Sequence, residues 1–501
     1  MDLFPQLISG FAVALQPANL FYCFLGCLIG TLVGVLPGLG PTAAMALLLP
    51  ATFHVAPVTA VIMLAGIYYG AMYGGSTTSI LVNIPGEAAS VMTCLDGYQM
   101  ARQGRAGAAL GMSAFASFIA GTIGIVGLTL MAPPLASFAL KFGPPEYFSL
   151  MCMGMVVLSF LTGASMTRSL MMACFGIIAG TVGTDTVSGS TRFTFGLTEL
   201  MDGVGLVPLV MGLFGISEII LNLEQHIDRD VFKTKVGSLL PSLSDWVAVR
   251  WALVRGTVIG FLLGILPGGG AVLSSFVSYA VEKRIAKDPE RFGQGAIEGV
   301  AAPEAANNAA AQSAFIPLLT LGLPANVVMA LLLGALILHG VTPGPLLLTK
   351  NPDIFWGVVA SMYLGNIMLL VLNLPLIGLW VQLLRIPYPY MMPAIVLFCI
   401  VGSYTVANSV TDVYLMLGFG VLGYLMKKLK FDAPPLVLAF VLGPLIEYYF
   451  KSALMYSRGS FAVFVTRPIS LACLVVTGLI LAWSLFTALR RRPSIIPKEE
   501  P

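Results

Sequence analysis

The stretch Gly30–Pro41, GTLVGVLPGLGP, decides how this chain must fold, because Pro and Gly interrupt an apolar segment there. A closely similar stretch, GFLLGILPGGGA, occupies Gly260–Ala271. Pro disrupts the preceding helical turn, and Gly admits backbone conformations closed to other residues. An unpaired amide in hydrocarbon costs several kcal/mol, so such a break survives only inside protein or beside a polar cavity. Two breaks at corresponding places predict a binding site between two repeated halves.

The composition indicates a membrane protein. Of the 501 residues, 57% are hydrophobic and only 10% are charged, against roughly 25% charged in soluble domains. Apolar runs of about 18 residues or more recur from end to end, and an outer-membrane barrel would instead show short alternating segments. We predict an all-α polytopic membrane protein with about ten to twelve transmembrane helices. The net charge of +3 is spread over loops and gives no indication of nucleic-acid binding.

The repeat extends beyond the two breaks. Pro144–Gly180 resembles Pro387–Tyr424, since each has a Pro–aromatic start, a long apolar run, a short polar loop and a second apolar run. The broken segments can be read as complete spans or as re-entrant hairpins. We predict a first transmembrane repeat over residues 18–225, a second over 245–450, and an additional C-terminal transmembrane helix over 469–489.

Basic residues in the loops predict that the second repeat is inverted. In the first half Arg102 and Arg105 follow a polar stretch, whereas in the second Lys283 and Arg284 precede the corresponding one. Cytoplasmic loops are enriched in Lys and Arg, so we expect equivalent loops on opposite sides of the membrane. The exceptions to this bias are Lys141, Arg192, Lys451, Arg458 and Arg467.

The residues at both breaks are candidates for binding an anion. The helix that follows each break presents free amide groups and a positive dipole end, which can hold a carboxylate without a buried Arg or Lys. The structural alternative is a kink, or close helix packing through small residues. The candidates are Gly38, Gly40 and Thr42 at the first break and Gly268, Gly269 and Gly270 at the second.

Each half also contains a polar stretch that ends in a Pro-containing turn, Tyr73–Gly86 in the first and Pro303–Asn326 in the second. Hydroxyls and amides suit an anionic substrate or a partly dehydrated cation. Alternatively, such side chains bond to their own helix and bridge it to others. The predicted substrate-binding residues here are Ser76, Thr77, Thr78, Asn83, Gly86, Asn307, Asn308, Gln312 and Asn326.

Ionisable residues near apolar segments are few and are functional candidates by default. Glu87 and Glu304 flank the two polar stretches and, with Ser79, are our candidates for a coupling ion, Na+ or H+; helix capping or an interfacial charge is the alternative. The others are Asp96, Asp185, Glu218, Glu298 and His339. The sequence has no HExxH, Walker A or GxSxG motif, so we predict no enzyme, no metal site and no cofactor.

Several long motifs together resemble the large membrane subunit of the tripartite tricarboxylate transporters, the TctA family. They are PGLGPTAAMALLLP (37–50), YGGSTTSILVNIPGEAASV (73–91), and residues 96–111, 264–271 and 298–324. The resemblance covers nearly the whole chain. It implies a symporter in the bacterial inner membrane that imports citrate or other carboxylates. It also implies two partners, a small membrane subunit of about four helices and a periplasmic solute-binding protein.

These observations lead us to expect a permease core that binds an organic carboxylate between two broken hairpins near the bilayer midplane. Both rocking and an elevator-like movement are open as the mode of alternating access. A passive channel and an intramembrane enzyme are the rival interpretations. The enzyme requires a nucleophile–base or metal constellation, and the sequence offers none.

Overall fold

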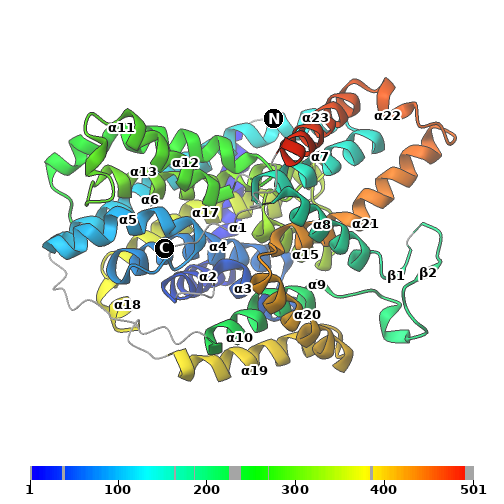
Figure 1. Cartoon of the computed structure of the whole chain (residues 1–501), viewed down its shortest axis with the longest axis horizontal. Helices are drawn as coiled ribbons and strands as arrows, with labels where there is room; N and C mark the ends of the chain where they lie inside the picture. Colours follow the sequence, from blue (N-terminus) through cyan, green and yellow to red (C-terminus); the bar gives the residue numbers. More distant parts are fainter. Residues whose placement is uncertain are drawn as a thin grey trace.

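The structure, a computed structural model, describes residues 3–36, 40–162, 165–185, 187–224, 238–268, 270–383 and 388–490. Helices make up most of this part of the chain, with one pair of two-residue strands (Figure 1). Ten helical segments among the described residues are long and apolar enough to cross a membrane. The prediction of an all-α polytopic membrane protein is therefore confirmed. The inverted relation of the two halves stays a prediction.

The first half runs through ten α-helices and the strand pair. The helices are α1 (Leu3–Ala14), α2 (Pro17–Val35), α3 (Gly40–Leu48), α4 (Pro57–Val82), α5 (Val91–Met100), α6 (Ala106–Ala139), α7 (Pro144–Thr162), α8 (Met166–Gly180), α9 (Leu206–Val210) and α10 (Ser217–Glu224). Strands β1 (Gly183–Thr184) and β2 (Thr191–Arg192) pair antiparallel between α8 and α9. Short 3-10 turns occupy Pro50–His54, Ala88–Ser90 and Thr198–Leu200, and π-helical turns occupy Ala101–Arg105 and Met211–Ile216.

The second half has a similar succession of long, broken and short helices. It comprises α11 (Leu243–Ile265), α12 (Gly270–Ile285), a 3-10 turn (Pro289–Arg291), α13 (Glu298–Ser313), α14 (Phe315–Leu321), α15 (Val327–Leu338), α16 (Leu347–Lys350), α17 (Pro352–Asn373), α18 (Ile377–Leu383), α19 (Tyr388–Ala407), α20 (Val410–Lys428) and α21 (Ala433–Tyr456). The chain ends in α22 (Val463–Thr466) and α23 (Pro468–Arg490). Gly38 and Gly269, one residue of each break, lie outside the described residues.

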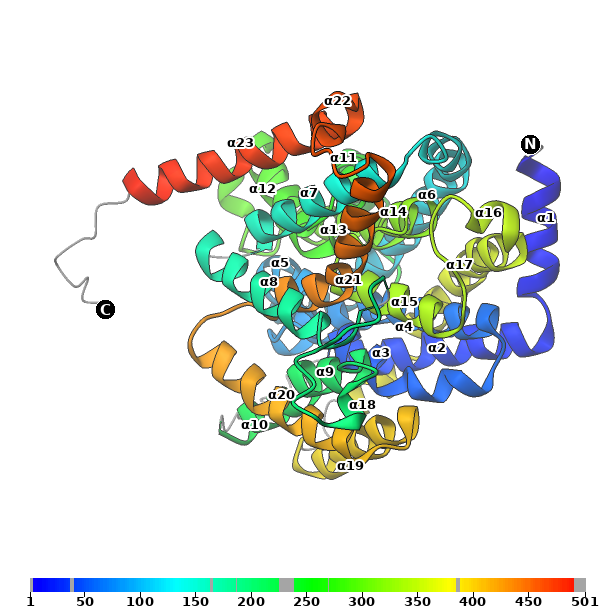
Figure 2. The same ribbon diagram turned by 90° about the vertical axis from the view of Figure 1, so that its right-hand side faces the viewer.

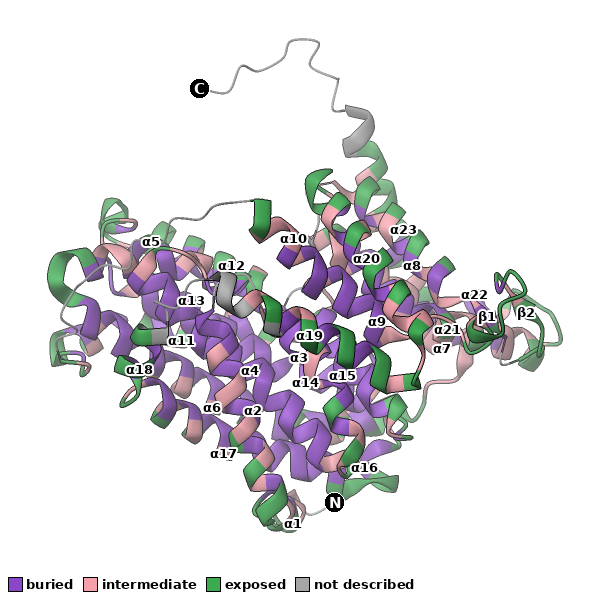
Figure 3. Ribbon diagram, turned by 90° about the horizontal axis from the view of Figure 1, so that it is seen from below, coloured by how far each residue is buried: buried purple, intermediate pink, exposed green. Residues whose placement is uncertain are grey.

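Helices of the two predicted repeats are interleaved. α17 lies against α1, α2, α4 and α6, while α13 packs on α4 and α6. On the other side α21 packs on α7 and α8, and α23 lies along α7 (Figure 2). The central helices α4, α13 and α15 are buried along almost their whole length, and exposed residues gather at the periphery (Figure 3). The polar stretches of both halves are therefore placed in the protein interior.

Glycines let α2 approach α4 backbone to backbone. Gly26, Gly30 and Gly34 recur once per turn along α2 and meet Gly66, Gly70 and Gly74 of α4. A methyl group at Gly30 would lie only 2.5 Å from the carbonyl oxygen of Ile67, and one at Gly74 only 2.2 Å from that of Thr31. Small residues permit this close approach, which is a common way of packing helices in membranes.

The same arrangement recurs between α11 and α13. Gly256, Gly260 and Gly264 of α11 meet the backbone at Ala302, Ala306 and Ala310 of α13. A methyl group at Gly260 would lie 2.1 Å from the carbonyl oxygen of Ala306. The glycines that precede both breaks therefore serve helix packing. In each half, these glycine contacts pack the helix that precedes the break, α2 or α11, closely against the polar helix, α4 or α13. We call each of these two contacts a glycine seam.

Ion pairs connect the strand pair to α21. Lys451 donates to Asp185 at 2.6 Å, and Arg192 donates to Glu447 at 2.8 Å. The Lys451 ammonium, helped by Ser188, holds the pKa of the Asp185 carboxyl well below its usual range. Arg192 and Lys451 are two of the basic residues that depart from the predicted loop bias, and their charges are neutralised here. Ion pairing with Lys451 and Arg192 thus accounts for the presence of the Asp185 carboxylate.

The α11–α13 seam gives a direct test of the packing. Gly260→Ala should lower the apparent melting temperature of the detergent-solubilised chain, because overpacking costs about 1–3 kcal/mol. Gly418→Ala in α20 is the matched control, since nothing lies within 4 Å of the added methyl group there. Equal melting temperatures for the two variants would contradict the seam. Fluorescence-detected size exclusion after a temperature series makes the measurement.

Candidate functional site

A cavity of about 590 Å³ opens where the two breaks meet. Its walls include the starts of three helices, at Gly40–Thr42 of α3, at Gly270–Leu273 of α12 and at Asn326–Val328 just before and within α15. The 3-10 turn that follows Glu87 contributes a fourth N-terminal end. The remaining lining residues are Tyr68, Met72, Leu158, Leu161, Gly268, Phe276 and Pro434. The cavity therefore joins both halves of the chain, as the repeated motif predicted.

The charge of this cavity is unusual for a polar site. Among its described lining residues there is no Lys, Arg or His, and Glu87 is the one carboxylic acid. First-turn N–H groups of a helix have no partner within the helix, and aligned peptide dipoles give that end a partial positive charge. Positive potential in the cavity must then come from the helix ends of α3, α12 and α15. Such ends are ready-made sites for carboxylate or phosphate groups.

The second break is tied to the turn before α15. Gly268 adopts a φ of 80°, which favours glycine, and its N–H donates to the carbonyl oxygen of Ala325 at 2.8 Å. Asn326 caps α15, because its Oδ1 accepts from the N–H of Met329 at 2.9 Å. Its Nδ2 donates to the hydroxyl of Tyr68 at 3.2 Å, across to α4. Three of the predicted residues, Gly268, Gly270 and Asn326, therefore line the cavity.

The first break is held by backbone contacts from its own half. Gly40 and Thr42 line the cavity at the start of α3. Thr78 points away from it and donates to the carbonyl oxygen of Val35 at 2.6 Å, at the end of α2. Gly86 packs where α2 crosses α4, so a methyl group there would lie 2.0 Å from the carbonyl oxygen of Gly34. Thr78 and Gly86 thus stabilise the first break through their contacts with the end of α2.

Glu87 lines the cavity, and one of its two carboxylate oxygens has a hydrogen-bond partner while the other has none. Its side chain is 7% exposed. Oε2 accepts from the N–H of Ala89 at 2.6 Å, whereas Oε1 is buried without a hydrogen-bond partner. Below it Ser79 donates to the hydroxyl of Ser90 at 2.9 Å. Helix capping, the alternative weighed for Glu87, is present, and the free oxygen is available in addition.

Glu304 lies in a separate polar cluster on α13, outside the lining of the cavity. Its Oε1 accepts from Ser76 at 2.7 Å and from Thr93, and its Oε2 accepts from Ser117 at 3.2 Å. Asn308 donates to Ser117 at 2.7 Å. This cluster joins α4, α5, α6 and α13 at the centre of the molecule. These buried hydrogen bonds bridge the four helices. A role for Ser76 and Asn308 in substrate binding, and for Glu304 in binding a coupling ion, stays a prediction.

The other predicted residues lie away from the described cavity lining. Asn307 Nδ2, Asn308 Oδ1 and both polar atoms of Gln312 are buried without a hydrogen-bond partner. Thr77 is also buried, on α4. Asn83 is exposed and takes the left-handed conformation that ends α4, with a φ of 59°. A role for these five side chains in substrate binding stays a prediction.

The remaining ionisable candidates have structural partners. Asp96 Oδ1 accepts three backbone N–H groups, from Gly293, Gly295 and Ala296, and so shapes the loop before α13. His339 is the residue that ends α15. The carboxylates of Glu218 and Glu298 pair with Lys427 and Arg291, respectively.

Our sequence interpretation missed several polar residues inside the protein. Tyr68 lines the cavity, and Tyr73 donates to Asn366 of α17 at 2.6 Å. Thr93 and Ser117 complete the Glu304 cluster. Asn366 is an amide in the middle of a strongly apolar helix, and that contrast is the signal that could have identified it.

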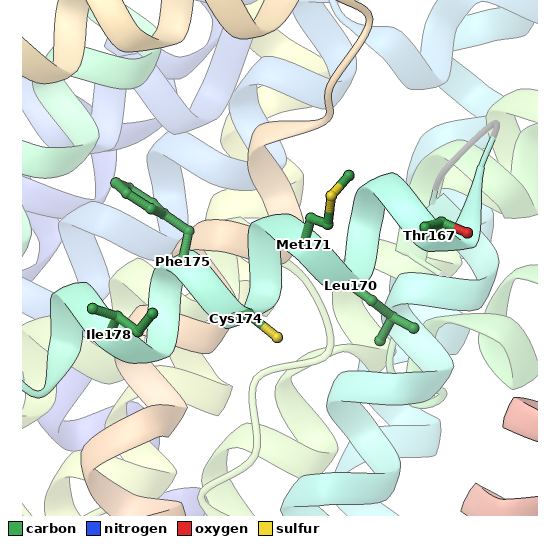
Figure 4. A pocket seen from close by; sticks show the side chains of 6 residues that line it. All are labelled: Thr167, Leu170, Met171, Cys174, Phe175 and Ile178. Carbon is green, nitrogen blue, oxygen red and sulfur yellow. The ribbon is translucent and has the colours of Figure 1, made fainter.

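A second hollow, of about 480 Å³, lies along the outer face of α8 (Figure 4). Its lining comes from this single helix and is almost wholly apolar: Thr167, Leu170, Met171, Cys174, Phe175 and Ile178. It offers no charged group and no cluster of polar groups to an anion. The cavity between the two breaks is the better candidate site.

Comparison with known proteins identifies the family of this chain. The sequence model of the tripartite tricarboxylate transporter TctA family matches residues 20–438. The chain belongs to the TctA family. Two relatives come from Agrobacterium vitis: an uncharacterized 52.8 kDa protein in the TAR-I ttuC' 3' region, and an uncharacterized protein in the TAR-II ttuC' 3' region. The first is 51% identical over 500 residues and the whole of both chains. The second is 57% identical over 221 residues, 44% of this chain and 91% of its own. No solved structure matches.

The Glu304 cluster of this TctA protein can be tested by stability. Ser117→Ala removes a donor to Glu304 and the acceptor of Asn308, so it should destabilise the chain by about 1–3 kcal/mol. Ser137→Ala is the control on the same helix, because Ser137 is exposed and bonds only within α6. Thermal unfolding in one detergent compares the two. A Ser117→Ala melting temperature equal to that of Ser137→Ala would contradict the cluster.

Proposed function

We propose that this TctA protein is the permease subunit of a binding-protein-dependent secondary transporter that imports tricarboxylates or related organic carboxylates. The observation that supports this most strongly is the cavity of about 590 Å³ in which helix N-termini from both breaks converge, with no basic side chain among its described lining residues. Ligand cavities commonly measure about 300–1,000 Å³, so the volume suits a small organic acid. The substrate's carboxylates would accept from first-turn N–H groups of α3, α12 and α15.

The polar and apolar parts of the cavity suit this substrate class. Tyr68 and Asn326 offer a hydroxyl and an amide beside the helix ends, and Thr42 offers a second hydroxyl. Leu158, Leu161 and Phe276 provide an apolar wall against the carbon skeleton. Helix dipoles bind an anion more weakly than a bidentate Arg does. Weaker binding is compatible with release into the cell, which a transporter requires.

The proposal extends to partners and energy source. Membership in the TctA family supports a complex with a small membrane subunit and with a periplasmic solute-binding protein that delivers the substrate. Import would take place in the bacterial inner membrane and use a gradient of Na+ or H+. No group of His, Cys, Asp and Glu among the described residues is arranged to hold a metal ion. A passive channel is the rival, and accumulation against a concentration gradient distinguishes the two.

A pair of substitutions at one residue tests the anion site. Asp and Ser both serve as helix N-caps, so Asn326→Asp and Asn326→Ser should each keep α15 intact. Asp adds a negative charge to the cavity, and a like charge about 5 Å from a carboxylate costs about 3 kcal/mol at an effective dielectric constant of about 20. Asn326→Asp should therefore reduce citrate uptake at least tenfold, while Asn326→Ser retains most of it.

Uptake of labelled citrate and of labelled succinate is measured in cells that express the chain with its two partner subunits. Equal amounts of each variant in the membrane fraction must be verified by immunoblot. Equal uptake by the two variants would contradict an anion site at the start of α15. Failure of the unaltered protein to accumulate either acid while ion gradients are intact would favour the channel.

A further inference from the structure

Glu87 is a carboxyl group placed where a carboxylate substrate would bind. It lines the cavity between the breaks and also the adjoining hollow of about 260 Å³ beside Gly86 and Phe214. Its Oε1 is buried without a partner, while Oε2 is held by the N–H of Ala89. The free oxygen and the helix ends of α3 and α12 belong to one enclosure. This juxtaposition is independent of the family comparison.

Two negative charges cannot share this enclosure at low cost. No basic side chain among the described lining residues separates them. Coulomb repulsion is several-fold stronger in a partly dehydrated cavity than in water. When two carboxylates occupy one site, protonation of one of them removes the repulsion. Glu87 can accept that proton on Oε1 without losing its cap, because Oε2 still accepts from Ala89.

The titratable neighbours of Glu87 are paired with other groups, so Glu87 is the group whose protonation responds to a bound carboxylate. Glu304 on α13 has both oxygens engaged by hydroxyls in its own cluster, and Glu218 is paired with Lys427. On α12, Tyr279 donates to Asp96, and Glu282 is paired with Arg255. The remaining titratable groups near Glu87 on α4 and α5 are Tyr68 and Cys94, and neither a phenol nor a thiol carries a positive charge in any protonation state. None of these groups supplies a cation to Glu87.

We propose that Glu87 binds one proton each time the cavity binds a carboxylate, so that substrate and proton enter the cell together. This inference rests on the proposed function and names its coupling ion. A proton from the outer aqueous phase adds to Oε1, and the neutral carboxyl then donates a hydrogen bond to the substrate carboxylate. When the substrate leaves on the inner side, that hydrogen bond is lost and the proton dissociates into the cytoplasm. One proton is carried per substrate, and no bond other than O–H is made or broken.

The test uses Glu87→Gln, a neutral side chain of the same shape. Citrate and succinate binding to the full-length chain in lipid nanodiscs is measured by calorimetry between about pH 6 and about pH 8, because a carboxyl that shares a site with a second carboxylate keeps its proton to higher pH than a free one. In the unaltered protein affinity should fall at least tenfold as the pH rises, because Glu87 becomes charged. Glu87→Gln should bind at least tenfold more tightly than the unaltered protein at the high pH. A gain in binding cannot result from misfolding.

Glu298→Gln is the matched control. Glu298 also has one carboxylate oxygen buried without a partner, but it lies at the start of α13, and its other oxygen is paired with Arg291. The Glu298→Gln variant should bind citrate with the same pH dependence as the unaltered protein. Because citrate itself ionises equally in every measurement, comparison with this control removes that contribution. Calorimetry in two buffers of different ionisation enthalpy should show one fewer proton taken up by Glu87→Gln than by Glu298→Gln.

The outcomes separate the two proposals. If Glu87→Gln keeps the pH dependence of Glu298→Gln, or loses binding at every pH while retaining its melting temperature, proton coupling at Glu87 is wrong and the carboxylate transporter stands. If the unaltered protein binds neither acid at any pH, the proposed function fails, and the inference fails with it.

Discussion

The structure depends on one constraint: every helix that is interrupted inside the membrane frees backbone groups that must be paired. Here the freed backbone groups of each half form hydrogen bonds with side chains of the same half and with other backbone groups. Thr78 donates to the last carbonyl of α2, Asn326 accepts at the start of α15, and the N–H of Gly268 bonds to Ala325. Such breaks are tolerated only where they are buried in protein or line a cavity. The glycine seams supply the burial, and the cavity receives the helix ends that stay unpaired.

This arrangement connects packing to chemistry. The seam residues Gly30 and Gly260 bring α2 and α11 so close to α4 and α13 that the following breaks are fixed at the centre of the fold. The Glu304 cluster crosslinks α4, α5, α6 and α13 behind the site. Within the part of its lining that the structure describes, the cavity then holds the positive ends of several helices, one carboxyl group and no basic residue. Under the proposed function, the binding of an anion there would depend on backbone geometry, so a change in helix position would alter affinity without moving any salt bridge.

Much of this could be predicted from the sequence. The repeated Pro–Gly break and the apolar runs indicate the fold class. Gly40, Thr42, Gly268 and Gly270, which the sequence singles out, line one cavity in the structure, and their role in substrate binding stays a prediction. The Glu304 cluster was only half predicted, because Thr93 and Ser117 come from helices far away in the sequence and meet Glu304 through tertiary packing. Residue type alone also could not show that Thr78 faces a carbonyl and Asn83 ends a helix, since a hydroxyl or an amide suits a ligand and the backbone equally well.

The central claim is that helix N-termini from the two breaks together hold a carboxylate, and a structure of the protein with bound citrate tests it most directly. The account predicts citrate density in the cavity, with carboxylate oxygens within hydrogen-bonding distance of N–H groups in the first turns of α3 and α12 and near Asn326. Citrate bound within the Glu304 cluster, or on the outer face of α8 with the cavity empty, would contradict it.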